Sequence, residues 1–184
     1  LEAREEAGTP NVIGDIRAAL AFIVKDAVGA EEIAEREARY NAMALEGWRE
    51  NPHLVLLGAE HPHRLPIFSF LVRDGQGRPV HQQLFTRMLS DVHGIQARGG
   101  CACAGPYAHR LLGIGREASE RLRADLAAGR EMEKPGWVRL NFSYLMSEET
   151  VRFIIDAVND LSRRGGEVAA QYRADPATAR FKAA

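Results

Sequence analysis

The stretch WVRLNFSY at residues 137–144 constrains the fold most, because it alternates at the period of a β-strand. Successive side chains of a strand point to opposite faces of a sheet. One face of this strand would be apolar and pack on a core, and the other would direct Arg139 toward solvent or a neighbouring domain. The apolar positions are Val138, Leu140, Phe142 and Tyr144, and the opposite positions are Trp137, Arg139, Asn141 and Ser143.

The remaining pattern mixes strands with amphipathic helices. Residues 65–72 (LPIFSFLV) read as the strongest strand, and residues 53–57 and 95–97 as short ones. Apolar residues at helical spacing predict helices from Val12 to about Gly29, over 30–50, from Val80 to Gly94, over 117–129, and from Ser147 to Gly165. The economical packing of these elements is an α+β fold: a small, mostly antiparallel sheet with helices covering one face.

Two of the predicted helices carry specific expectations. Asn11 is a suitable N-cap for the first helix, whose apolar stripe from Val12 to Ala27 should lie on a core. Ser147 should cap the last helix, with Glu148 in its first turn. The inward positions expected for the second helix are Ala34, Ala38, Leu45 and Trp48, and those expected for the last helix are Val151, Ile154, Ile155, Val158 and Leu161.

Composition excludes several function classes. The chain has 184 residues, 46% of them apolar, and a net charge of −1, which suits one compact domain. A near-neutral surface offers no electrostatic footprint for nucleic acid or for an anionic membrane. Its apolar runs are too short to span a bilayer, and no secretory signal is present. Two cysteines do not form a disulfide framework, so we expect a cytoplasmic protein.

Both cysteines lie in one glycine-rich segment, IQARGGCACAGPYAHRLLG at residues 95–113. A thiol that has an arginine nearby and a helix beginning just after it has two reasons for a lowered pKa. The alternative is that Cys101 and Cys103 are small buried apolar side chains, which is the commoner fate of free cysteine. A metal site is disfavoured, because the Cys-x-Cys spacing and the scattered histidines fit no ligand template.

Three stretches resemble the C-terminal part of the class V group of pyridoxal-phosphate enzymes of fold type I, which includes cysteine desulfurases, selenocysteine lyases and related aminotransferases. The first is the sequence EAGTPN at residues 6–11, before a long helix. The second is Arg98-x-Gly100-x-x-Cys103-Ala104-x-Pro106. The third is Arg139 on a strand, followed by Ser147-x-Glu149 at the last helix. The resemblance covers nearly the whole chain.

The resemblance implies a role for four residues. Thr9 would reach the cofactor phosphate of the partner subunit in a homodimer, although a turn threonine before a proline is the simpler interpretation. Cys103 would be the desulfurase nucleophile that accepts sulfur and becomes a persulfide. Arg139 would bind the α-carboxylate of the substrate. Arg98 would assist in substrate binding, or else order its loop by bonding to carbonyls.

The sequence also departs from the desulfurase pattern. Gly99 and Ala102 stand where desulfurases often have a hydroxyl residue and a histidine, and Cys101 is an extra thiol. It stays open which cysteine would react. Aminotransferases of the same group need no cysteine here, so a desulfurase-like and an aminotransferase-like activity are both compatible.

The resemblance implies a cofactor lysine that follows a histidine, ahead of residue 6. None of the three lysines, Lys25, Lys134 and Lys182, follows a histidine. We therefore expect residues 1–11 to be a linker from an absent N-terminal large domain, 12–166 the small domain, and 167–184 a tail that drapes over the surface or frays. Such a segment would be inactive and hold no pyridoxal phosphate alone. The alternative is a stand-alone thiol carrier or a structural interaction domain.

Overall fold

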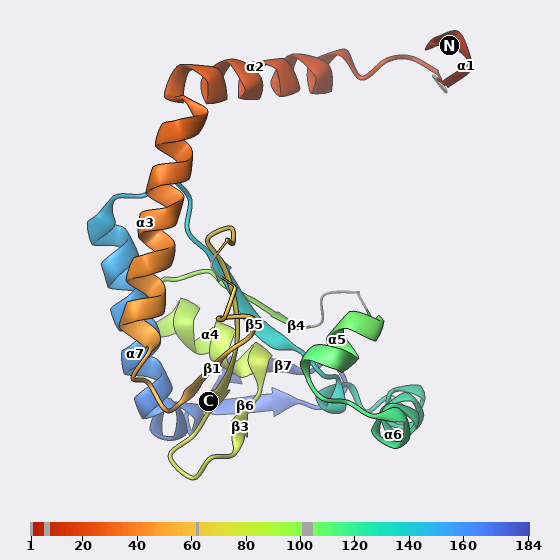
Figure 1. The fold of residues 1–184 in the computed structure, drawn as a ribbon. Coiled ribbons are helices and arrows are strands. Elements are labelled where there is room, and N and C mark those ends of the chain that lie inside the picture. The colour runs from red at the N-terminus through yellow and green to blue at the C-terminus, as the bar shows by residue number, and fades with distance from the viewer. Residues whose placement is uncertain (1, 6–7, 62, 101–104) are drawn as a thin grey trace.

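The computed structural model describes residues 2–5, 8–61, 63–100 and 105–184 (Figure 1). Helices and strands alternate along most of the chain, and a β-hairpin follows the last helix. The elements are α1 (Glu2–Glu5), α2 (Val12–Val28), α3 (Ala30–Trp48), β1 (Leu54–Leu56), β2 (Ile67–Arg73), β3 (Pro79–Val80), α4 (Gln82–His93), β4 (Arg98–Gly100), α5 (Gly105–Leu111), α6 (Arg116–Ala127), the 3₁₀ turn η1 (Glu131–Glu133), β5 (Trp137–Asn141), α7 (Glu148–Ala169), β6 (Tyr172–Asp175) and β7 (Arg180–Ala183).

The main sheet has the strand order β1-β2-β5-β4, and β3 pairs with the end of β2. Every pair is antiparallel. Helices α3, α4 and α7 lie together on one side of this sheet (Figure 1). The predicted α+β fold, with a small antiparallel sheet covered on one face, is confirmed.

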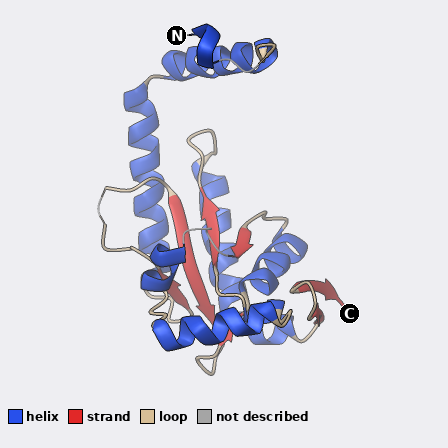
Figure 2. Cartoon of the chain, turned by 90° about the vertical axis from the view of Figure 1, so that its right-hand side faces the viewer, coloured by secondary structure: helices blue, strands red, loops and turns tan. Residues whose placement is uncertain are grey.

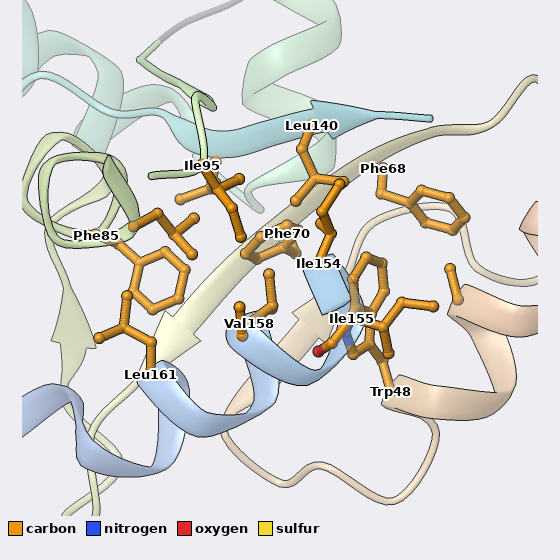
Figure 3. Close-up of a cluster of buried hydrophobic side chains, with 14 of the residues drawn as sticks. Trp48, Phe68, Phe70, Phe85, Ile95, Leu140, Ile154, Ile155, Val158 and Leu161 are labelled. Carbon is orange, nitrogen blue, oxygen red and sulfur yellow. The ribbon is translucent and has the colours of Figure 1, made fainter. Parts of the chain in front are cut away.

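The core lies between that sheet face and the three helices (Figure 3). Phe68 and Phe70 of β2 are fully buried, as the period-2 pattern requires. Trp48, at the end of α3, meets Phe68 edge-on with ring centroids 5.1 Å apart. Its indole nitrogen donates to the carbonyl of Ile155 at 3.3 Å, so the largest core side chain is also satisfied as a donor.

Helices α3 and α7 approach closely enough to require a glycine. A Cβ on Gly47 would lie 2.5 Å from Cγ2 of Ile155. Just beyond α3, the amide of Asn51 donates to Asn159 at 2.6 Å and to the buried Ser162 at 2.9 Å. Packing and polar contacts together fix how these two helices cross the sheet.

The predicted helix ends are confirmed where the sequence contains a capping residue. The side chain of Asn11 accepts from the Gly14 amide at 3.1 Å, and that of Ser147 accepts from the Thr150 amide at 3.2 Å. Gly94 ends α4 in the left-handed region at φ 69°. All five positions predicted for the inner stripe of α7 are buried.

Four predictions about local structure are wrong. The strand expected at 95–97 lies at Arg98–Gly100, and Val80 belongs to β3 instead of α4. Gly165 and Gly166 do not end α7, which continues to Ala169 because Gly165 and Val168 are buried against the domain. The C-terminal residues neither drape nor fray as irregular chain but form the hairpin β6–β7, in which Tyr172 donates to Asp91 of α4 at 3.1 Å.

The expectations for α2 and α3 are met only in part. Helix α2 forms as predicted but has no buried residue; its apolar stripe does not lie on the core of this chain. In α3 the buried positions include Tyr40 and Ala44, while Ala34 and Ala38 are exposed. The cause is visible in Figure 1, where α2 and the first half of α3 project beyond the sheet. Across the described residues, no helix combines the length and apolarity needed to cross a membrane.

Candidate active site on the uncovered sheet face

The face of the main sheet opposite α3, α4 and α7 is called here the uncovered face; Figure 2 looks toward it. Alternation along β5 directs Val138 and Leu140 into the core and leaves Arg139 and Asn141 exposed on the uncovered face. The predicted direction of Arg139 is therefore confirmed. Trp137 differs from expectation, because it lies on this face but is only 4% exposed.

The strand register brings two of the predicted site residues together. Arg98 of β4 is directly opposite Arg139 of β5, and Ser69 of β2 is opposite Arg139 on its other side. Directly opposed residues of antiparallel strands have Cα atoms about 4.5–5.5 Å apart. Ser69, Arg139 and Arg98 thus form one row across the uncovered face, which we call the arginine row.

The arginine row places two positive charges side by side on the uncovered face. Both arginines are exposed, and within the described part of the chain no carboxylate forms an ion pair with either. Like charges directly opposite on a sheet are destabilising. A bound carboxylate or phosphate relieves that repulsion, and two planar guanidinium groups can hold it with several charge-assisted hydrogen bonds.

Three glycines set the course of β4 toward the cysteines. A Cβ on Gly99 would lie 2.7 Å from the Gln82 carbonyl oxygen, and one on Gly136 would lie 2.5 Å from the Gly100 carbonyl carbon. Gly100 has φ 123°, which L side chains rarely adopt. The side chain of Gln83 also donates to the Gly99 carbonyl at 3.2 Å. Cys101 and Cys103 follow directly, but they lie outside the described residues.

Arg98 also lines a polar pocket of about 270 Å³ beside β4. Lys134 and Glu131 lie on one side of it, and Thr178 contributes from the turn of the C-terminal hairpin. Lys134 faces Glu131 at 3.8 Å, so one of the two cations in this pocket is partly neutralised. The sequence pattern did not predict that the C-terminal hairpin reaches the pocket beside β4, because the hairpin is about 80 residues from β4 along the chain.

His81 is a further residue that the sequence did not single out. Its Nδ1 accepts from the Gln83 amide at 3.2 Å and so caps α4. Burial lowers its pKa, and the Met132 carbonyl and the charge of Glu133 oppose that shift. A histidine N-cap has no strong sequence signal, because serine, threonine, asparagine and aspartate dominate that position.

The structure does not bring Thr9 to the arginine row. Thr9 is exposed before α2, and the lengths of α2 and α3 separate it from the sheet (Figure 1). A role toward a partner subunit, which the resemblance implies, stays a prediction. Among the described residues, no three histidines, cysteines or carboxylates gather closely enough to hold a metal ion.

Two comparisons with known proteins bear on the family of this chain. A search of curated proteins finds no match for this sequence. The model of the aminotransferase class-V family, by contrast, matches residues 1–153 of the 184. The matched part includes β4, β5 and the whole arginine row, and it ends within α7. The chain therefore belongs to the aminotransferase class-V family, whose full-length enzymes use pyridoxal phosphate.

Proposed function

We propose that this chain supplies the substrate-carboxylate site of a pyridoxal-phosphate enzyme that acts on an amino acid. The observation that carries the proposal is the register of β4 on β5, which sets Arg98 opposite Arg139 on the uncovered face. Arg139 binds the α-carboxylate through its planar fork, and Arg98 adds a second cation beside it. A lysine at position 139 would keep the charge but lose the two-point geometry.

The cofactor contributes the electron sink for chemistry at the α-carbon when it is bound. None of the three lysines of this chain suits the role of the covalent anchor of the cofactor. Lys25 is on α2, Lys182 is on β7, and the ammonium of Lys134 faces Glu131. We propose that the anchoring lysine belongs to an N-terminal large domain of a longer protein, which packs over the uncovered face and excludes water from the arginine row. In a homodimer of that protein, Thr9 would bind the cofactor phosphate of the partner subunit.

A cysteine desulfurase is the narrower candidate, and it is favoured by the place of Cys103 in the sequence, three residues after Gly100 at the end of β4. Its thiolate would attack the sulfur of a cysteine substrate, whose carbon–sulfur bond would break with the electron pair left on the substrate, and Cys103 would become a persulfide. A free thiol of this kind would serve in the reducing cytoplasm. An aminotransferase-like reaction uses the same carboxylate site without the thiol.

The arginine proposal is tested by kinetics of the longer protein that carries the cofactor lysine. Arg139→Lys should lower kcat/KM by about 10- to 100-fold, which corresponds to one charged bidentate contact. Arg173→Ala, an exposed arginine on β6, serves as the matched control and should leave kcat/KM unchanged. Retention of full kcat/KM in Arg139→Lys and Arg139→Ala would remove the carboxylate role.

The thiol proposal is tested separately. Cys103→Ser should abolish release of sulfide from cysteine, while Cys101→Ser should retain it. Unchanged sulfide release in the double variant Cys101→Ser/Cys103→Ser would exclude the persulfide route, and absence of sulfide release from the unmodified longer enzyme would leave the aminotransferase-like candidate. If the 184-residue chain itself carried persulfide sulfur without cofactor, a stand-alone thiol carrier would replace both candidates.

A further inference from the structure

The main sheet has a gap beside the arginine row. Along one edge of β2, residues Ile67 to Phe70 pair with β5, and Val72 and Arg73 pair with β3. Leu71, between them, pairs with neither, and a pocket of about 230 Å³ lies at this point between the start of β5 and β3. Its lining includes Leu71, Arg73, Pro79, Met132, Lys134 and Trp137.

The pocket adjoins the arginine row and is lined from both faces of the sheet: Leu71 and Trp137 belong to the uncovered face, and Phe70 and Val138 to the core face. Trp137 precedes Arg139 by two residues on β5, and Leu71 follows Ser69 by two residues on β2. Residues two apart on a strand point to the same face, with Cα atoms about 6.7 Å apart. The pocket-lining residues Trp137, which is nearly buried, and Leu71, which is half-buried, are therefore the next positions along β5 and β2 from the arginine row on the same face.

The size and lining of the pocket indicate what occupies it. Pockets for whole drug-sized ligands begin at about 300 Å³, so this one suits a single substituent of a larger ligand. The apolar side chains of Trp137, Leu71, Pro79 and Met132 offer water few hydrogen bonds, while the polar part of the lining comes from Arg73, His81, Gln82 and Lys134. Apolar groups gain by replacing water in such surroundings.

We propose that this pocket binds the side chain of the amino-acid substrate whose carboxylate is held by Arg139, and that this side chain is apolar and larger than that of cysteine. The proposal therefore favours the aminotransferase-like candidate over the cysteine desulfurase, whose substrate is cysteine. Leucine, methionine and phenylalanine represent the class. The inference rests on the proposed function, because the carboxylate must first be anchored in the arginine row. Trp137 is then the residue that determines specificity, since its ring forms the wall nearest to Arg139.

The lining also contains two exposed cations, Arg73 and Lys134, which could favour an acidic substrate side chain instead of an apolar one. Arg73 donates to the Gly77 carbonyl at 3.0 Å, and Lys134 faces Glu131 at 3.8 Å, so each already has a partner within the domain. An acidic side chain would have to compete with those contacts. Preference for an acidic ligand is therefore an outcome that overturns the proposal.

The direct test is a binding titration of the 184-residue chain, followed by tryptophan fluorescence. The probes are 4-methylpentanoate, acetate, glutarate and 4-methylpentanol, which separate the apolar tail from the carboxylate. We expect 4-methylpentanoate to bind at least tenfold more tightly than acetate or glutarate, and the alcohol to bind no better than acetate. Trp137→Phe should abolish the emission change, because Trp137 lines the pocket whereas Trp48 belongs to the core cluster away from it.

Variants separate the pocket from the arginine row. Leu71→Ala, at a half-buried position, should reduce the preference for 4-methylpentanoate over acetate, and Arg139→Ala should weaken both carboxylates equally. Ile67→Ala, on the same face but on the other side of the arginine row, is the control and should change neither. Binding of 4-methylpentanoate followed by nitrogen–proton NMR checks the result for any variant whose emission does not respond.

The outcomes are distinct. If the binding of acetate and of 4-methylpentanoate depends on Arg139 but the two bind alike, the pocket proposal is wrong and the carboxylate site stands. If no carboxylate depends on Arg139, both proposals fall. In the longer enzyme, the matching result is a kcat/KM for leucine or phenylalanine at least tenfold above that for alanine or cysteine, with the ratio lowered by Leu71→Ala.

Discussion

At the scale of single residues, His81 couples the start of α4 to pH. The neutral ring accepts the Gln83 amide, and burial lowers its pKa below the ordinary 6.5, against the Met132 carbonyl and the Glu133 charge. Between the folded-state pKa and 6.5 the unfolded chain binds the proton and the folded chain does not. The free energy of unfolding should therefore fall as the pH drops below 6.5, as measured by urea unfolding at pH 7.5 and 5.5.

The variant His81→Asn separates this effect from other titrations. Asparagine caps helices well and does not titrate, so the variant should lose part of the decrease in stability between pH 7.5 and 5.5. The cap itself is worth about 1 kcal/mol. An identical decrease in wild type and variant would show that His81 is not the group responsible.

Gly136 is the second residue with a measurable role. An alanine there would place its Cβ 2.5 Å from the Gly100 carbonyl carbon, and backbone atoms cannot yield as a flexible side chain can. Gly136→Ala should lower the free energy of unfolding by about 1–3 kcal/mol. Gly75→Ala, where a Cβ meets nothing within 4 Å, should have an effect below about 0.5 kcal/mol. Equal stability of the two variants would contradict the close approach of β4 and residue 136.

At the scale of elements, α7 shows how packing overrides local preference. Gly166 lies in the helix interior, is exposed, and has nothing within 4 Å of its Cβ position. Gly166→Ala should raise the free energy of unfolding by about 0.5–1 kcal/mol, because alanine restricts the unfolded chain and favours helix. The urea midpoint measures this gain.

Gly47 in α3 is the matched control for that substitution. It is also helical, but an added Cβ would lie 2.5 Å from Cγ2 of Ile155 on α7. Gly47→Ala should therefore be destabilising in spite of its better helix propensity. A gain in stability at both glycines would mean that α3 and α7 do not pack as closely as the structure has them.

At the scale of the whole molecule, α2 stands apart from the core. Ile16 is 51% exposed, whereas Val158 of α7 is fully buried. Ile16→Gln should change the free energy of unfolding of this chain by less than about 0.5 kcal/mol, while Val158→Gln should cost several kcal/mol. A large loss in Ile16→Gln would show that the α2 stripe is buried within the chain itself.

The lysine positions lead to a prediction about the cofactor. The 184-residue chain mixed with pyridoxal phosphate should show no lysine-bound absorbance band after gel filtration, because Lys25 and Lys182 lie on α2 and β7 and the ammonium of Lys134 faces Glu131. Borohydride treatment followed by mass spectrometry measures any covalent product. Stoichiometric labelling of Lys134 would refute the proposal that the cofactor-anchoring lysine belongs to a separate large domain.

The sequence alone determined much of the fold through local rules. The period-2 alternation in β5 was enough to direct Arg139 away from the core, since the face of a side chain depends only on its parity along the strand. Asn11, Ser147 and Gly94 marked helix ends because caps act through backbone groups a few residues away. The resemblance placed the chain in its family before any contact was known.

Only the tertiary structure decided how distant segments meet. The pairing of Arg98 with Arg139 joins residues 41 positions apart, and no local pattern specifies that register. Trp137 shares the face of Arg139 yet is only 4% exposed, a burial that the parity of the strand does not specify. Helix α7 runs through two glycines because its buried face outweighs their helix propensity. The proposed roles of Cys103 and Thr9 remain predictions, since they depend on segments that the arginine row does not itself position.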